Sequence, residues 1–227
     1  MPIYKTKDED FFKKWSSEMA YILGFFIADG SLTINPRGSK YIDFGITDGD
    51  LLFEIRKVLK SNHRISKINR GDNCKKVYRL QIGSKEMFND LLKLGLKVNK
   101  TGKEVLPKVP NIYFKDFIRG YFDGDGGVWS GLCHKKDRKK PTKVLMVTFT
   151  SGGNEMLRKI ACRLNKSIGT KLKRITYYGN AFRLQYSMND SIKLYNFMYK
   201  EINNKMLFLK RKKDIFDSFI NHNAGVA

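Results

Sequence analysis

An internal repeat is the sequence feature that most constrains the fold of this chain. Residues 77–82 (VYRLQI) resemble residues 181–186 (AFRLQY), which lie 104 positions further along. An earlier pair of segments, residues 23–30 (LGFFIADG) and 119–126 (RGYFDGDG), lies 96 positions apart and occurs in the same order. Co-linear similarity of this kind indicates two copies of one supersecondary unit.

A third pair of segments predicts an insertion in the second copy. Residues 44–47 (FGIT) align with residues 147–150 (VTFT) at an offset of 103. Because the offset grows by seven between the first block and this one, we expect extra residues in the second copy. The lysine-rich segment 133–140 has no counterpart in the first copy and is the predicted place for them.

The two copies share one predicted order of elements. Apolar residues spaced three or four apart indicate helices, and alternating patterns indicate strands. The first copy is expected to contain a helix, two strands, a helix, two strands and a helix, over residues 12–28, 31–35, 40–47, 50–60, 64–70, 76–82 and 85–94. The second copy repeats this order and adds a longer basic helix over about residues 207–220.

This order predicts an α+β fold of two αββαββα repeats with antiparallel sheets. Residues 97–111 are expected to form a linker, because Pro107 and Pro110 interrupt helices there. The predicted domains are an N-terminal half over residues 1–96 and a C-terminal half over residues 112–227.

The charge of the chain indicates an anionic partner. Its 44 Lys and Arg residues exceed its 22 Asp and Glu residues, which gives a formal net charge of +22. Such an excess repels itself in a folded protein, and nucleic-acid phosphates would neutralise it. A merely soluble basic protein, or one bound to an anionic membrane surface, is the alternative. The hydrophobic fraction of 41% argues against a disordered chain.

The cysteines and histidines limit the kinds of metal site and catalytic site that are expected. Cys74, Cys133 and Cys162 form no CxxC pair, and the three histidines are isolated from one another. Zinc centres, disulfide frameworks and histidine-based triads are therefore not expected. No apolar run is long enough to span a membrane, and the first residues match no signal or transit peptide. The expected location is a reducing intracellular compartment, either cytoplasm or organelle matrix.

The first helix of each copy ends in a candidate catalytic carboxylate. Small residues four positions apart share one face of each helix: Gly24 with Ala28, and Gly120 with Gly124. Such faces let two helix backbones pack closely, which would bring Asp29 near Asp125. Carboxylates at helix C-termini meet the negative end of the helix dipole, so their approach favours a bound cation. Mg²⁺ prefers such oxygen ligands and can activate water for phosphodiester hydrolysis.

The repeat also separates the two acids of the second copy. Asp125 aligns with Asp29, whereas Asp123 aligns with Ile27. Only Asp29 and Asp125 are shared, so these two are the expected catalytic metal ligands. Asp123 is expected to be a packing or capping residue.

Residues 21–30 and 117–126 resemble the two motifs of the LAGLIDADG homing endonucleases, with one departure at Ile27. Together with the repeated units, the resemblance covers nearly the whole chain. It implies a monomer whose two motif helices pack between two saddle-shaped sheets that straddle double-stranded DNA. It further implies site-specific cleavage of both strands across the minor groove of a long pseudo-palindromic site, with intron or intein mobility. Mg²⁺ is the implied cofactor, with Ca²⁺ or Mn²⁺ as substitutes, and no protein partner or membrane is implied.

The resemblance also implies residues that surround the metal. They are Lys100 and Lys212 (or else Lys205) as lysines near metal-bound water, Ala28 and Gly124 as backbone-carbonyl ligands, and Asp48 and Ser151 as groups that position water. For the lysines, a solvated or phosphate-contacting role is the equal alternative.

Strand alternation predicts which side chains face DNA. Leu32 and Ile34 are expected to point into the core from the first strand, and Ile42, Phe44 and Ile46 from the second. Both copies carry Arg-x-Gln on the opposite face, where arginine suits guanine and glutamine suits adenine. A plain solvated face is the alternative. The predicted DNA contacts are Ser31, Thr33, Asn35, Arg37, Tyr41, Asp43, Arg64, Arg70, Arg79, Gln81, Trp129, Lys171, Lys173, Arg183 and Gln185, with Lys139 and Lys140 on phosphates.

A double-strand endonuclease is the leading hypothesis. The alternative is an RNA-splicing maturase, or a DNA-binding protein of the same fold that does not cleave, and a structural basic protein is the third. Retention of both shared acids favours the enzyme.

Overall fold

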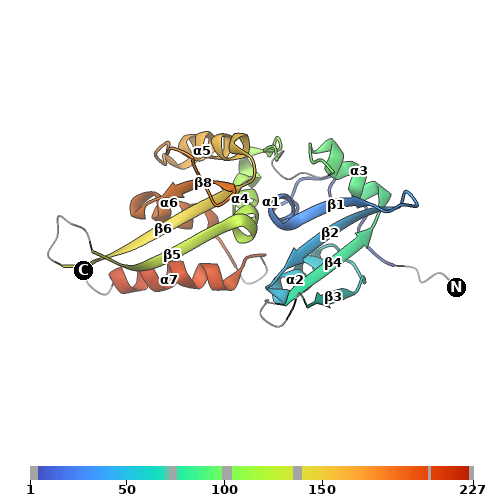
Figure 1. Ribbon diagram of the computed structural model, residues 1–227, viewed down its shortest axis with the longest axis horizontal. Helices are drawn as coiled ribbons and strands as arrows, with labels where there is room; N and C mark the ends of the chain where they lie inside the picture. Colours follow the sequence, from blue (N-terminus) through green and yellow to red (C-terminus); the bar gives the residue numbers. More distant parts are fainter. Residues whose placement is uncertain are drawn as a thin grey trace.

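The computed structural model describes residues 5–69, 71, 76–98, 104–134, 140–203 and 206–224 and contains two four-stranded antiparallel sheets. Their strand orders are β1-β2-β4-β3 and β5-β6-β8-β7, so the two sheets have the same topology. Figure 1 shows one sheet on each side of the molecule, with helices α1 and α4 between them. The fold is α+β with two repeats, as the sequence predicts.

The first repeat follows the predicted order of elements. It consists of α1 (Ser17–Asp29), β1 (Gly30–Ile34), β2 (Lys40–Ile46), α2 (Gly49–Val58), β3 (Ile65–Ile68), β4 (Val77–Gly83) and α3 (Lys85–Lys93). Helix α1 begins at Ser17 rather than at residue 12, because the Ser16 hydroxyl accepts a hydrogen bond from the Met19 amide and caps the helix. After α3, Gly95 has a φ of +95°, a conformation that glycine adopts readily at helix ends.

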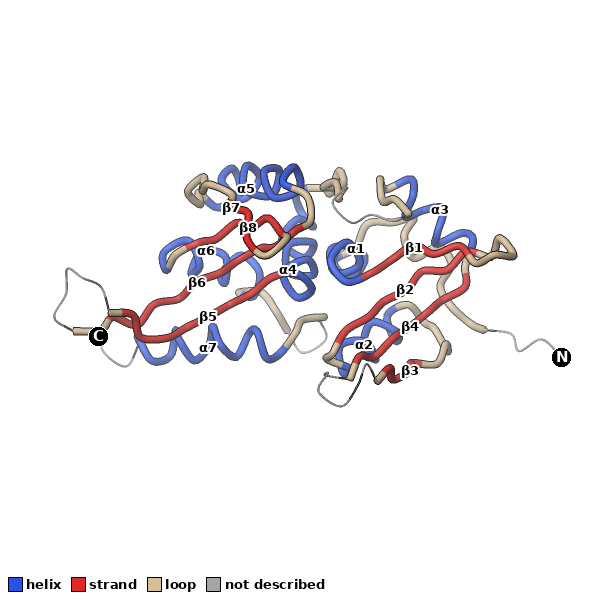
Figure 2. The backbone as a smooth tube through the Cα atoms, in the orientation of Figure 1, coloured by secondary structure: helices blue, strands red, loops and turns tan. Residues whose placement is uncertain are grey.

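The second repeat has the same order and one additional helix. It consists of α4 (Phe114–Asp125), β5 (Gly126–Cys133), β6 (Thr142–Ser151), α5 (Asn154–Ile168), β7 (Thr176–Tyr178), β8 (Ala181–Tyr186) and α6 (Met188–Tyr199). The short 3₁₀ helix η1 (Asn111–Tyr113) precedes it, and α7 (Lys210–Ala224) follows it. Figure 2 shows α7 running alongside β5, which it contacts. The extra helix therefore packs on the second half, and its first turn also reaches the first half through Arg211 and Asp48.

The strand register corrects the predicted alignment of the two halves. Gly30 pairs with Phe44 in the first sheet, and Gly126 pairs with Phe149 in the second. Phe44 therefore corresponds to Phe149, an offset of 105 rather than 103. Strands β5 and β6 have 8 and 10 residues, against 5 and 7 in β1 and β2. Most of the extra residues thus lengthen a hairpin, whereas the sequence alone predicts them all in segment 133–140.

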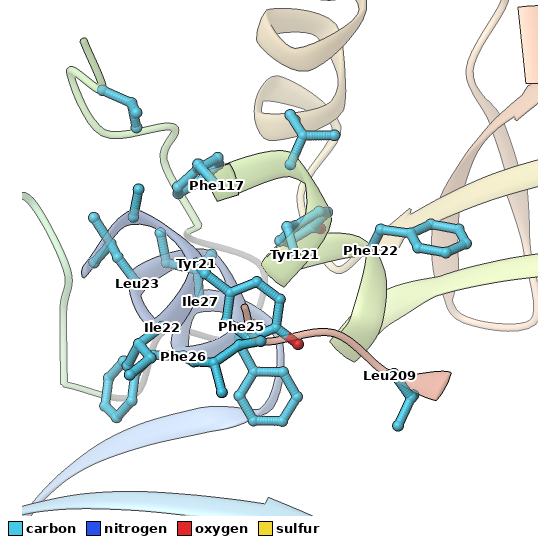
Figure 3. Packing of buried hydrophobic residues seen from close by; sticks show 14 of the residues in the cluster. Tyr21, Ile22, Leu23, Phe25, Phe26, Ile27, Phe117, Tyr121, Phe122 and Leu209 are labelled. Atoms are coloured by element: carbon cyan, nitrogen blue, oxygen red, sulfur yellow. The ribbon is translucent and has the colours of Figure 1, made fainter. Parts of the chain in front are cut away.

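Helices α1 and α4 meet at glycines that allow their backbones to touch. A Cβ atom on Gly24 would collide with the Phe117 carbonyl oxygen, and one on Gly120 would collide with the Tyr21 carbonyl oxygen. The predicted close packing of these two faces is confirmed. Figure 3 shows the apolar side chains around the junction, among them Ile22, Phe25, Phe26, Tyr121 and Phe122. Burial of these side chains offsets the cost of about 1 kcal/mol for each glycine within a helix.

Each sheet buries one face under helices and leaves alternate residues on the other face partly exposed. Ile42 and Phe44 are fully buried and Ile46 nearly so, which confirms the predicted core face of β2. Ile34 is 51% exposed, so its predicted inward position is wrong. It is the last residue of an edge strand, next to the hairpin turn, where the core ends. In the described parts of the chain, no helix combines the length and apolar character that a bilayer span requires.

Candidate functional site

The two motif helices end against each other. The Asp29 carboxylate oxygen Oδ2 lies 3.3 Å from the position that a Cβ atom on Gly124 would occupy, and Ala28 packs at the same point. Gly124 immediately precedes Asp125, so the end of α1 lies against the end of α4. Both carboxylates also act electrostatically on the Lys212 ammonium. The structure therefore gathers Asp29, Asp125 and Lys212 in one cluster, and their catalytic roles stay predictions.

Lys212 is buried at the C-terminal end of α4. Its residue is 4% exposed, and Nζ donates to the carbonyl oxygens of Phe122, Asp123 and Gly126 at 2.6, 2.8 and 2.6 Å. A longer contact of 3.3 Å reaches the Gly124 carbonyl. Burial lowers the pKa of Lys212 to about 8, although the neighbouring carboxylates oppose this shift. A cation in this position offsets the negative end of the α4 dipole, beside the carboxylates.

Asp123 is a buried structural residue rather than a second site acid. Its Oδ2 accepts hydrogen bonds from the Tyr21 hydroxyl at 2.7 Å and from the Leu209 amide at 2.8 Å. The Tyr199 hydroxyl donates to Oδ1 at 3.4 Å. Burial raises the pKa of Asp123, although these bonds and Lys212 oppose the shift. The prediction that this residue packs or caps is confirmed, because it ties α1, α6 and the start of α7 to α4.

A hollow of about 710 Å³ opens at the helix junction and extends under the first sheet. Its lining joins the helix ends to the partly exposed face of β1, β2 and β4, and includes Ala28, Asp29, Ser31, Thr33, Asp43, Thr47, Arg79, Gly124 and Arg211. The paired helix ends and the sheet face therefore form one continuous surface, open to a large ligand.

The oxygen ligands at the helix ends fit a magnesium ion whose coordination shell is completed by substrate and water. Asp29 and Asp125 offer two carboxylates, and Mg²⁺ usually binds proteins through one or two carboxylates together with waters and phosphates. Within the described residues, no group of three or more His, Cys, Asp or Glu side chains could hold a metal alone. The Gly124 carbonyl accepts from Lys212 at 3.3 Å, but a carbonyl has two lone pairs and can also bind a cation.

The two residues predicted to position water are engaged in other contacts. The Asp48 carboxylate accepts from the Arg211 guanidinium at 2.9 Å; burial alone would raise the pKa of Asp48, but Arg211 lowers it overall. The buried Ser151 hydroxyl accepts from the Gly153 amide at 3.1 Å, just before α5 begins. The register aligns Ser151 with Ile46, so Asp48 and Ser151 do not occupy equivalent positions. Their water-positioning roles stay predictions.

On the first sheet, the predicted base-reading residues bind one another. The Asp43 carboxylate accepts from Arg79 Nε at 2.8 and 3.0 Å, and Arg79 Nη2 also contacts it. Gln81 Nε2 donates to the same carboxylate at 3.0 Å. Asp43 lies on the open face, between the buried Ile42 and Phe44, but it is only 6% exposed because Arg79 and Gln81 cover its carboxylate. Its contact with DNA stays a prediction. Asp43 is an anchor that fixes the orientation of Arg79 and Gln81 on the sheet.

On the second sheet, the same sequence pattern has different partners. Arg183 and Gln185 are exposed, as predicted. The Arg183 guanidinium lies 4.7 Å from the centre of the Tyr178 ring, and Gln185 Nε2 donates to the Met146 sulfur at 3.0 Å. Trp129, another predicted contact, is 46% exposed.

The remaining predicted contacts differ in their surroundings. Asn35 stabilises the first hairpin turn, because its Oδ1 accepts from the amides of Arg37 and Ser39 at 3.0 and 2.8 Å. Lys171 and Lys173 lie before β7, outside any strand. The residues that are exposed or partly exposed are Ser31, Thr33, Arg37, Tyr41, Arg64, Lys140, Lys171 and Lys173. Arg70, Lys100, Lys139 and Lys205 lie outside the described residues.

Arg211 is the site residue that the sequence did not predict. It lines the hollow and binds Asp48 of the opposite half. The basic run 210–213, which begins α7, was the available signal.

One family model and two relatives match parts of the chain. Residues 16–94 match the family model described as a LAGLIDADG-like domain. The Replication factor C small subunit of Methanocaldococcus jannaschii is 29% identical over 116 residues, which cover 50% of this chain and 6% of that protein. An uncharacterized protein of the same organism is 29% identical over 133 residues, which cover 57% of this chain and 45% of that protein. The chain thus spans less than half the length of either relative.

Solved structures share the fold over most of the chain. One is the I-LtrWI LAGLIDADG homing endonuclease bound to target DNA, with a TM-score of 0.59, 14% identity, and coverage of 96% of this chain and 92% of that one. The homing endonuclease I-WcaI bound to its DNA recognition sequence gives 0.60 and 18%, with 90% and 91% covered. I-SmaMI bound to an uncleaved DNA target in the presence of calcium ions gives 0.56 and 16%, with 85% and 87% covered.

Residues 16–94 match the LAGLIDADG-like domain model, and the chain shares its fold with LAGLIDADG homing endonucleases over most of its length. The resemblance seen in the sequence is confirmed at this level.

Proposed function

We propose that this protein is a site-specific, metal-dependent endonuclease that cleaves both strands of a long duplex DNA site. The observation that carries the proposal is the meeting of two Asp-Gly helix ends at the junction of two equivalent sheets. Each half supplies one carboxylate, and each sheet supplies one elongated face, as cleavage of two strands requires. The net charge of +22, together with the DNA bound to I-LtrWI and I-WcaI, supports DNA as the partner.

In this proposal Asp29 and Asp125 bind the divalent cations, with the carbonyls of Ala28 and Gly124 as further ligands. Magnesium held by these groups would supply positive charge that activates water and stabilises the leaving oxygen of a phosphodiester. I-SmaMI bound its uncleaved DNA target in the presence of calcium ions, which supports a divalent cation at such a site. Lys212 holds positive charge beside both carboxylates and keeps the end of α4 in place.

The protein is also proposed to act as a monomer. One chain already contains both helix ends and fills the contact between them with its own side chains. Within the described residues, both helix ends of the site come from one chain, so the proposed site does not require a second copy. Sedimentation of the protein with and without DNA tests this, and a dimer as the cleaving species would contradict it.

The test uses duplex sites recovered by the protein from a randomised DNA library. With Mg²⁺, the unaltered protein should cut both strands, while Asp29→Asn and Asp125→Asn should each cut at least about 100-fold more slowly. Asp50→Asn, at an exposed acid in the first turn of α2, is the matched control and should cut normally. Cutting that survives both substitutions would refute the assignment.

Binding without any cutting by the unaltered protein would favour the alternative function. The chain would then be a maturase or another non-cleaving nucleic-acid-binding protein of this fold. Addition of EDTA separates the two further, because cleavage should stop while binding to the duplex persists in part.

A further inference from the structure

We infer that the second sheet recognises thymine methyl groups in its half of the DNA site, through an apolar strip formed by Trp129, Val144 and Met146. The inference rests on the proposed function and deepens it, because it assigns the kind of sequence that one half of the site must contain. The strip is a property of the second half, since the corresponding surface of the first sheet is polar.

The strip lies on the face of the sheet that the helices leave uncovered. Leu145 is fully buried in the core, so Val144 and Met146 on either side of it point to the opposite face. The register places Trp129 directly opposite Met146, and Gly131 directly opposite Val144. Three apolar side chains on two adjacent strands therefore form one continuous patch.

The indole ring of Trp129 lies over Gly131, which has no side chain to obstruct it. A Cβ atom on Gly131 would lie 2.8 Å from Cη2 of the Trp129 ring, so a larger residue there would displace the indole. At Gly127, on the other side, a Cβ atom would meet nothing within 4 Å. The indole is thus held in place and is still 46% exposed.

Of the two polar side chains on β8, Gln185 contacts the strip and Arg183 is turned toward β7. Gln185 donates to the sulfur of Met146 at 3.0 Å, and the Arg183 guanidinium stacks over Tyr178. In the equivalent positions of the first sheet, Arg79 and Gln81 bind a carboxylate instead.

The register identifies the counterparts of the strip in the first sheet. Thr33 and Tyr41 pair with each other there, as Trp129 and Met146 do in the second sheet. Asp43, which pairs with Gln81, has Thr148 as its counterpart. The first face is therefore hydroxylic and charged, whereas the second is apolar with threonine methyls beside it.

Thymine is the base that such a surface fits. In the major groove it presents a C5-methyl group, and apolar side chains distinguish it by contact with that methyl. A two-stranded β-ribbon such as β5–β6 has the dimensions to enter that groove. Removal of one buried methyl weakens binding about threefold to fourfold.

The test replaces thymidine in the DNA by 2′-deoxyuridine, which removes the C5-methyl group of the base and keeps the base pairing. Library-selected duplexes are prepared with uracil in one half-site, in the other, or in neither, and their affinities are measured. We expect uracil to weaken binding about tenfold or more in one half-site and less than twofold in the other. Equal effects in both half-sites, or none in either, would overturn the inference.

Variants of the protein then assign the sensitive half-site to the strip. In a Trp129→Ala, Met146→Ala double variant, uracil should no longer weaken binding, because the methyl contacts are already lost. The matched control is Thr33→Ala, Tyr41→Ala, in which the uracil effect should persist. Persistence of the effect in the Trp129 and Met146 double variant would also overturn the inference.

Failure of the inference is distinguishable from failure of the proposed function. Normal cleavage of every uracil-containing duplex, with unchanged affinity, overturns the inference alone. Absence of any binding or cutting of the unmodified duplexes overturns both. Melting temperatures of the variants, expected within a few degrees of the parent protein, establish that they are folded.

Discussion

Helices α1 and α4 occupy equivalent places in the two halves and each end at an aspartate followed by a glycine, yet they are built differently. In α1, residues from Met19 to Ile27 are buried and are apolar apart from the Tyr21 hydroxyl and Gly24. Helix α4 instead buries Asp116, Arg119 and Asp123.

The buried charges of α4 connect it to the elements around it. Arg119 binds Asp116 at 2.8 Å and the carbonyls of Met198 and Leu207 at 3.1 and 3.0 Å. Lys212 of α7 reaches the end of the same helix. The two helices are thus alike in the small residues at their crossing and unlike in the buried charges of α4, one of which, Asp123, also binds Tyr21 of α1. Geometry at the shared axis is constrained by both copies, whereas each outer face is free to find its own packing.

The largest expected effect on stability comes from disrupting the close backbone contact between the two helices. Gly120→Ala places a Cβ atom against the Tyr21 carbonyl of α1. Because this carbonyl belongs to the backbone of a packed helix, it can move away only at a high energetic cost. We expect a loss of about 3 kcal/mol or more in the free energy of unfolding, although alanine favours helices. Urea unfolding measures it, with Gly127→Ala as the control because its added Cβ meets nothing within 4 Å. A parent-like midpoint for Gly120→Ala would mean that the backbones are not in contact.

A second prediction concerns a substitution that makes α4 resemble α1 at position 123, where the two motifs differ. Asp123→Ile installs the residue of the first motif, but leaves the Tyr21 hydroxyl and the Leu209 amide without their acceptor. We expect destabilisation of about 2–4 kcal/mol. Tyr21→Phe added to Asp123→Ile should recover about 1 kcal/mol, because it removes one orphaned donor. A stable single variant would show that Asp123 does not hold α4 to its neighbours.

A third prediction follows from the pKa of Lys212, which burial lowers to about 8 from 10.5. Between these values the unfolded chain binds more protons than the folded one, so this residue adds stability as pH rises through the window. From pH 7.5 to 9.5 we expect the parent protein to gain about 2 kcal/mol relative to Lys212→Met. Parallel stability curves for the two proteins over this range would contradict the burial of a titrating ammonium.

The smallest effect is expected at the ion pair between the halves. Arg211 is more than half exposed, so its bond to Asp48 is screened by solvent and should contribute no more than about 1 kcal/mol. Arg211→Ala should therefore unfold near the parent midpoint, and 1 M salt should remove the remaining difference. A loss above about 2 kcal/mol would indicate that this pair, and not the helix junction, holds the halves together.

The sequence predicted the shared features well because they repeat. Two copies of one pattern identified Asp29 with Asp125 and Gly24 with Gly120, and strand alternation located the core face of β2. The seven-element order of each half followed from the same periodicities.

The sequence did not predict features that depend on pairing between distant segments. The match of Thr47 with Thr150 suggested an offset of 103, because local similarity cannot reveal that a hairpin has grown along both strands. Asp43 alternates onto the open face, but burial of its carboxylate depends on Arg79 and Gln81, which lie 36 and 38 positions away in sequence. The contact of Lys212 with α4 requires α7 to return to the junction, which no local pattern encodes.

The longer β5–β6 hairpin affects how much DNA the second half could cover. Each strand is three residues longer than its counterpart, and a strand rises about 3.3 Å per residue, so the ribbon extends roughly 10 Å further from the centre. Along a duplex that distance corresponds to about three base pairs. Under the proposed function, the two halves of the DNA site would therefore differ in length as well as in sequence, and the midpoint of the site would be displaced from the point of cutting.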